Sequence, residues 1–139
     1  MAIVSRIKPT QPMDYRFQKH YSPEEATALL PQIRVWLGRL NELRGDLVKY
    51  DQRLGGLRGG GEDLGGDLVG KWIKAIAELK GVLDEFQRRE IFIKDVERGL
   101  LDFPALIGGR EVFLCWELDE ENVEHWHDLD SGYAGREPL

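Results

Sequence analysis

The chain has 139 residues, of which 42% are hydrophobic and 32% charged, and its formal net charge is −6. The acidic balance disfavours nucleic acid as a partner, because that affinity comes from clustered lysine and arginine. No apolar run approaches the roughly 18 residues that a membrane span requires. The single cysteine, Cys115, agrees with a reducing compartment. We therefore expect one soluble, cytoplasmic domain over residues 1–139, with neither nucleic acid nor a membrane as its partner.

The first predicted element is a long helix over residues 22–54. Ser22 is expected as its N-cap, Pro23 as the first helical residue and Glu25 as the second member of a capping box. Apolar residues then recur at alternating spacings of three and four, which is a heptad pattern that stays in phase through Pro31. We expect a helix that continues past a kink at this proline. The seam residues are Ala26, Leu29, Ile33, Trp36, Leu40, Leu43, Leu47, Tyr50, Leu54 and Leu57.

A second helix is predicted over residues 67–90, after the glycine-rich segment 55–66. Glycine interrupts helices through its backbone entropy, so this segment is expected to form the tip of a helical hairpin. The heptad spacing returns in the second helix, which indicates that the two seams pack against each other. The residues of the second seam are Val69, Trp72, Ile76, Leu79, Leu83 and Phe86.

The period changes from helical to strand-like in residues 91–118. Three short apolar runs separated by turn residues predict a small, mainly antiparallel sheet. In the last run every second side chain is expected to face the helices. The predicted strands are Ile91–Lys94, Leu100–Phe103 and Glu111–Leu118, and the residues expected to face the helices are Val112, Leu114, Trp116 and Leu118.

Residues 119–139 are predicted to form a short helix, placed at Asp119–Asp128, and a tail. The elements together predict an α+β fold. In this fold a long antiparallel, coiled-coil-like helical hairpin packs on a small antiparallel sheet, and a short C-terminal helix and tail follow.

Cys115, Glu120 and His127 are a candidate set of metal ligands, because thiolate, carboxylate and imidazole are the donors of divalent transition-metal sites. Their spacing matches none of the compact ligand motifs. The alternative is that Trp126 packs on the sheet and His127 hydrogen-bonds to a carboxylate or carbonyl group. Cys115 would act as a nucleophile only beside a base such as His127, so we assign no catalytic residue.

Asp102, Arg110 and Arg136 are a second candidate set, for binding an anionic ligand. The arginine guanidinium is a planar fork that suits bidentate pairing with a carboxylate. The favoured alternative is structural: Asp102 pairs with an arginine and holds the C-terminal tail on the sheet.

Several short motifs in a constant order resemble the bacterial family catalogued as domain of unknown function 2203. The resemblance covers about residues 17–139, and it implies no activity because the family has none established. One departure is Asp119, where the family pattern leads us to expect a glycine. The motifs are Ser22-Pro23-Glu24-Glu25-Ala26, Leu29-Leu30-Pro31, Lys94-Asp95, Gly99-Leu100-Leu101-Asp102-Phe103-Pro104-Ala105, Gly109-Arg110-Glu111-Val112-Phe113-Leu114-Cys115-Trp116, Trp126-His127 and Gly132-Tyr133-Ala134-Gly135-Arg136.

The heptad pattern is a stronger functional signal than either candidate site. The apolar surface of the two helices is larger than the helices can cover by packing against each other. The leading interpretation is a non-enzymatic protein interaction or assembly module, homodimeric through its helices. The alternative is a small protein, enzymatic or not, that binds a ligand or a divalent transition metal. Its site would lie between the last strand, the short helix and the tail.

Overall fold

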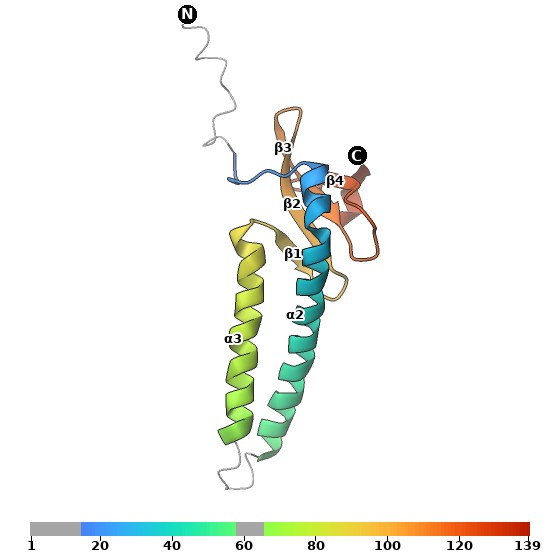
Figure 1. The fold of residues 1–139 in the computed structure, drawn as a ribbon. Coiled ribbons are helices and arrows are strands. Elements are labelled where there is room, and N and C mark those ends of the chain that lie inside the picture. The colour runs from blue at the N-terminus through green and yellow to red at the C-terminus, as the bar shows by residue number, and fades with distance from the viewer. Residues whose placement is uncertain (1–14, 58–65) are drawn as a thin grey trace, which may run out of the picture.

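The computed structural model describes residues 15–57 and 66–139, and its largest feature is a hairpin of two helices (Figure 1). Helix α2 spans Pro23–Leu57 and helix α3 spans Gly66–Arg88, and the two lie side by side. The predicted hairpin is therefore confirmed. Most of its predicted tip, residues 55–66, lies outside the described residues. None of the described helices has the length and apolar composition that a membrane crossing requires.

Helix α2 begins with the predicted capping box. The backbone N–H of Ser22 donates to Glu25 Oε1 at 2.8 Å, and the N–H of Glu25 donates to Ser22 Oγ at 3.0 Å. The helix continues through Pro31 without a break. It ends at Leu57, three residues later than predicted, so Gly55 and Gly56 belong to the helix.

Helix α3 ends two residues earlier than predicted, because Glu90 adopts a left-handed conformation with φ of 56°. The N–H of Ile91 then donates to the carbonyl of Phe86, and the N–H of Glu90 donates to that of Gln87. These two bonds form a Schellman motif, which satisfies carbonyls of the last helical turn. The motif turns the chain from α3 directly into the sheet.

The sheet is an antiparallel meander in which the strands pair in chain order. Short turns connect the first three strands, as antiparallel pairing permits, and longer loops lead to the fourth and fifth. Gly99, Gly108 and Gly109 occupy turns with positive φ, a conformation that glycine adopts without a steric penalty. The strands are β1 (Phe92–Asp95), β2 (Leu100–Ile107), β3 (Arg110–Trp116), β4 (His125–Asp128) and β5 (Glu137–Pro138).

The hydrophobic core lies between the sheet and the first half of α2 (Figure 1). Alternate residues of β2 and β3 face it, as the period of two predicted for the last strand requires. The expectation for Val112, Leu114 and Trp116 is confirmed, and Leu118 packs at the edge of the core. From the helices the core takes Ala26, Leu30, Ile33, Leu37, Leu40 and Phe86, and from β2 it takes Leu101, Phe103 and Ala105.

The predicted helix at Asp119–Asp128 is wrong, because the last four of these residues form β4. His127 pairs with Phe113 of β3, and Trp126 pairs with Leu114 and packs against the core. The alternation of His125, Trp126 and His127 is therefore strand-like, with the two histidines on the face turned away from α2. The helical turn near the C-terminus is the 3₁₀ helix η2, at Tyr133–Gly135.

Candidate functional site

The buried face of α3 differs from the predicted seam. Leu68, Ala75 and Phe86 are buried, whereas Val69 and Leu83, which belong to the predicted seam, are each 39% exposed. Successive helical residues are about 100° apart, so Leu68 and Val69 lie on different sides of the apolar surface. Helix α2 covers only one of these two sides.

Four aliphatic side chains of α3 form a line beside the covered face, which we call the outer stripe. Ile73 is 55% exposed and Ile76 is half-buried. Successive members of this line are four, three and seven residues apart in the sequence, so the four side chains share one side of the helix. The outer stripe consists of Val69, Ile73, Ile76 and Leu83. Exposed apolar side chains that lie next to one another are a common feature of protein interaction sites.

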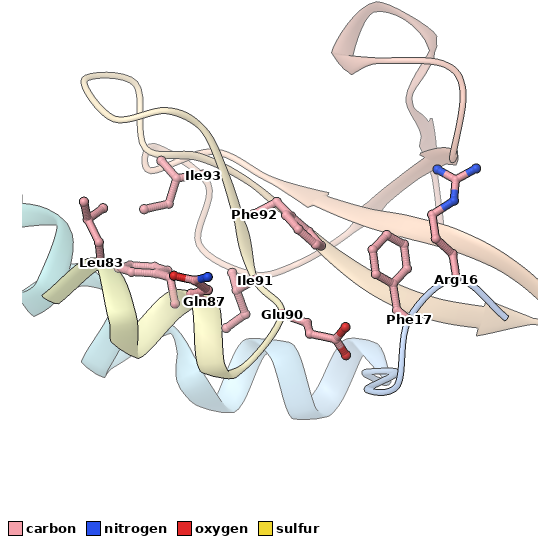
Figure 2. Close-up of a pocket in the computed structure, with 9 residues that line it drawn as sticks. Arg16, Phe17, Leu83, Gln87, Glu90, Ile91, Phe92 and Ile93 are labelled. Atoms are coloured by element: carbon pink, nitrogen blue, oxygen red, sulfur yellow. The ribbon is translucent and has the colours of Figure 1, made fainter. Parts of the chain in front are cut away.

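The outer stripe leads into an open, mainly apolar hollow of about 520 Å³ (Figure 2). Leu83 borders this hollow together with Ile93 of β1, so this end of the stripe lies next to the sheet. Phe17, from the segment before α2, stands opposite, and its ring centroid is 5.2 Å from that of Phe92. The complete lining is Arg16, Phe17, Leu83, Phe86, Gln87, Glu90, Ile91, Phe92 and Ile93.

Glu111 of β3 holds the segment that carries Phe17 in place. Its carboxylate accepts hydrogen bonds from the N–H groups of Arg16 at 2.8 Å and Phe17 at 3.0 Å, and lies 2.8 Å from His20 Nε2. Burial alone would raise the pKa of the Glu111 carboxyl, but the hydrogen bonds from His20 and the two backbone groups outweigh it and lower this pKa. The wall of the hollow is thus fixed by an ionised carboxylate.

A second candidate site is a buried polar cluster on the face of the sheet turned away from α2. Asp102, Cys115 and His127 come from three adjacent strands, β2, β3 and β4, and are 2%, 1% and 3% exposed. Asp102 and Cys115 are direct cross-strand partners, and His127 pairs with Phe113, two residues before Cys115. Antiparallel pairing at this register places the three side chains on one face.

Hydrogen bonds orient the His127 ring on both sides. Nδ1 lies 2.7 Å from the carbonyl oxygen of Asp128, which can only accept, so Nδ1 carries a hydrogen. Nε2 lies 2.9 Å from Asp102 Oδ1. One hydrogen bond therefore joins Nε2 and the carboxyl group of Asp102.

Cys115 lies beside this pair and its thiol is not activated. Burial raises the pKa of the Cys115 thiol to about 11, although Arg136, with Nη1 3.9 Å from Sγ, acts in the opposite direction. A protonated, buried thiol is a poor nucleophile. The geometry therefore gives no support to a cysteine nucleophile at this site.

Glu120, predicted as a ligand with Cys115 and His127, is engaged elsewhere. It pairs with Arg136 through two hydrogen bonds of 3.0 and 2.6 Å, and it also accepts from the N–H of Glu117. His125 Nδ1 lies 3.2 Å from Glu120 Oε2 without forming a hydrogen bond. The structure thus brings Cys115 and His127 together with Asp102, and places Glu120 with Arg136.

The three residues of the predicted anion site do not converge either. Asp102 contacts His127, Arg110 forms an ion pair with Asp128, and Arg136 holds Glu120. The alternative in which Asp102 pairs with an arginine is therefore wrong, because the strand register gives Asp102 a histidine partner. An arginine does hold the tail: Arg136 pairs with the carboxylate of Glu120 and not with that of Asp102.

Sequence reasoning named Asp102 as a site residue but placed it in the anion-binding set, not among the metal ligands, and it missed the outer stripe as a surface. Residues 100–103 and 111–118 were predicted as strands of a mainly antiparallel sheet, but their pairing and register were not, and it is the register that places Asp102 beside Cys115. The choice of which side of α3 is buried also had no signal in the sequence, because Leu68 and Val69 are both aliphatic.

The fold and these sites define an α+β protein with a helical hairpin on an antiparallel meander and a buried polar cluster. The family model described as "Uncharacterized conserved protein (DUF2203)" matches residues 19–139, and the chain belongs to this family. The family has no assigned function. No curated protein and no solved structure matches the chain.

Proposed function

We propose that this chain is a cytoplasmic assembly module that forms a homodimer through the outer stripe of α3. The observation that carries the proposal is the partial exposure of Val69, Ile73 and Leu83 beside the face that α2 covers. Removing such side chains from water stabilises an interface. The cytoplasmic location is supported by Cys115, which is buried and has no second cysteine in the chain with which to pair.

A second copy of the chain suits the outer stripe because the stripe is symmetric about Ile76. Val69 lies seven residues before Ile76, and Leu83 lies seven residues after it. Two α3 helices that cross antiparallel on a two-fold axis at Ile76 would place Val69 of one copy against Leu83 of the other. Such an isologous contact is self-complementary and closes at two subunits, and with both α2 helices it makes a four-helix arrangement.

The hollow extends this surface beyond the helix. Leu83 belongs to both, so a partner helix that covers the stripe also reaches the rim of the hollow. Phe17, Phe92 and Ile93 offer apolar walls there, with Arg16 and Glu90 at the polar edge. An apolar centre with a polar rim is typical of protein interfaces.

Sedimentation equilibrium over a range of concentrations tests the dimer. We expect Ile73→Glu to raise the dissociation constant at least about tenfold, because it places a charge in an apolar contact, and each tenfold step corresponds to about 1.4 kcal/mol. Val35→Glu is the matched control: Val35 is an aliphatic residue of α2 that is 64% exposed and lies off the stripe. It should leave the dissociation constant unchanged.

A cross-linking experiment tests the two-fold axis separately. Ile76→Cys should form an intermolecular disulfide under mild oxidation, since the residue meets its own copy at the axis, whereas Val35→Cys should not. Cys115 does not interfere because it is buried. A wild-type protein that sediments as a monomer at all concentrations would refute the proposal, and equal cross-linking at positions 35 and 76 would refute the axis.

A further inference from the structure

The buried polar cluster contains three different donor atoms that are suited to a metal ion. One oxygen of Asp102, Cys115 Sγ and a ring nitrogen of His127 all lie within 4.8 Å of one another. Charged and polar side chains this deeply buried normally form hydrogen-bonded pairs, as Asp102 and His127 do. A buried thiol such as that of Cys115 does not require a hydrogen-bond partner. Because Cys115 lies beside the Asp102–His127 pair, its sulfur atom adds a third possible metal donor.

We propose that Asp102 Oδ, Cys115 Sγ and His127 Nε2 bind a divalent transition-metal ion of the Zn²⁺ class. A mixed oxygen, sulfur and nitrogen donor set suits Zn²⁺ and Co²⁺, whereas Ca²⁺ and Mg²⁺ prefer sets made of oxygen alone. The ion would take the place of the hydrogen that lies between His127 Nε2 and Asp102.

The orientation of His127 supports this proposal. Metal-binding histidines characteristically donate the hydrogen of their other ring nitrogen to a carboxylate or a backbone carbonyl, which fixes the tautomer. In His127 this contact exists: Nδ1 donates to the carbonyl of Asp128 at 2.7 Å. The nitrogen that remains for a metal is Nε2, which faces Asp102 and the cluster.

The distances require only small adjustments. Zinc ligands lie about 2.0–2.3 Å from the ion, so two donor atoms in a tetrahedral site are about 3.3–3.7 Å apart. His127 Nε2 and Asp102 Oδ1, at 2.9 Å, are already closer than this and would separate slightly. The widest pair, within 4.8 Å, would close by about 1 Å, which a side-chain rotation can supply.

Arg136 completes the surroundings of the cysteine. Its Nη1 lies 3.9 Å from Cys115 Sγ and its two terminal nitrogens bind Glu120, so the guanidinium is held in place. A metal binds cysteine as the thiolate and releases the thiol proton. The fixed positive charge favours that thiolate, in the way that outer-shell contacts tune a bound metal.

A cavity of about 260 Å³ adjoins the three donors and offers room for a fourth ligand. A zinc site with three protein ligands keeps one position for water or a substrate. The cavity is wide enough for water, and Ser131 and Tyr133 contribute to its wall. Its other lining residues are Lys94, Leu100, Phe113, Leu129 and Gly132.

Titration of the chelator-treated, full-length protein with Co²⁺ alone tests the site. We expect one equivalent to produce visible d–d bands of a tetrahedral ion and a near-ultraviolet thiolate-to-cobalt charge-transfer band. The charge-transfer band reports Cys115 directly, since the chain contains no other cysteine. The absence of this charge-transfer band in the wild-type protein would by itself overturn the proposal.

Variants identify the other two ligands. Cys115→Ser should abolish the charge-transfer band. His127→Gln and Asp102→Asn should each lower the Co²⁺ affinity by more than the roughly 10–100-fold that loss of an outer-shell contact costs. The matched control is His125→Gln, on the same strand and face but outside the cluster, and it should bind Co²⁺ as the wild type does. Unchanged affinity in His127→Gln, or loss of the band in a His125→Gln protein with a native circular dichroism spectrum, would contradict the assignment.

Discussion

Arg136 holds the carboxylate of Glu120 with both terminal guanidinium nitrogens, Nη1 at 3.0 Å from Oε1 and Nη2 at 2.6 Å from Oε2. The two side chains are 15% and 17% exposed, so the ion pair is shielded from solvent on most sides. Arg136 directly precedes β5, and Glu120 lies in the loop between β3 and β4. The pair therefore fastens the segment that leads into β5 to the loop between β3 and β4, next to Cys115.

Replacing Arg136 tests this fastening. Arg136→Met should lower the free energy of unfolding by about 2–4 kcal/mol, because it leaves the Glu120 carboxylate shielded and unpaired. Arg136→Lys should cost less, since an ammonium group supplies the charge but cannot form both hydrogen bonds. Urea unfolding followed by circular dichroism measures both. Arg39→Met is the control: its partner Glu78 is 46% exposed, so solvent screens this pair and its loss should cost clearly less than the loss of Arg136. Equal losses at the two positions would contradict this account.

Two turn glycines with similar backbone angles should respond differently to alanine. Gly99 has φ of 65°, and a Cβ atom there would lie 2.6 Å from Cβ of Leu118. Gly108 has φ of 60° and nothing within 4 Å of such an atom. Gly108→Ala should cost about 1–2 kcal/mol through the left-handed backbone alone. Gly99→Ala should cost more, because Leu118 must also move. Thermal unfolding of the two variants would reveal this difference, and similar melting temperatures would rule it out.

The capping box of α2 should stabilise the fold by its two reciprocal hydrogen bonds. Ser22→Ala removes the acceptor for the N–H of Glu25 and should cost about 1 kcal/mol. Glu25→Ala removes the acceptor for the N–H of Ser22. A double-mutant cycle measured by urea unfolding should show that the two losses are not additive, because the residues form one motif. Additive losses would mean that the two bonds act independently.

The Glu111 carboxylate predicts a loss of stability in acid. Its folded-state pKa is lowered from 4.5, so its contribution is fully present above 4.5 and is lost as the pH falls through the lower, folded-state pKa. The cause is the set of hydrogen bonds from His20, Arg16 and Phe17. Urea unfolding of the wild type at neutral pH and below pH 4.5 measures this loss. In Glu111→Gln the same comparison should show a smaller change, and an identical change would exclude Glu111 as a source.

The helical parts of the fold could be predicted because their signals are local. The period of the apolar residues from Ala26 onward and the capping box at Ser22 depend on neighbours in the chain. The same local reasoning failed at residues 119–128, because His125–Asp128 is too short for periodicity to separate a helix from a strand. The pairing of this segment with β3 settled its conformation.

The candidate sites were less predictable because they depend on partners distant in sequence. Cys115 and His127 were recognised as a pair from the sequence, together with Glu120, whereas the carboxylate that lies beside them is that of Asp102 and Glu120 pairs with Arg136. Strand register decides which carboxylate lies next to a histidine. The register of β2, β3 and β4 places Asp102 next to His127.

By itself, the amino-acid sequence determined that two amphipathic helices form and that strands follow them, since periodicity and capping act over a few residues. Only the tertiary structure determined which side of α3 faces α2, leaving Val69 and Leu83 exposed, and which side chains meet at the buried cluster. The physical reason is that burial and hydrogen bonding between distant residues depend on how whole elements pack, and packing depends on the shape and register of all of them together.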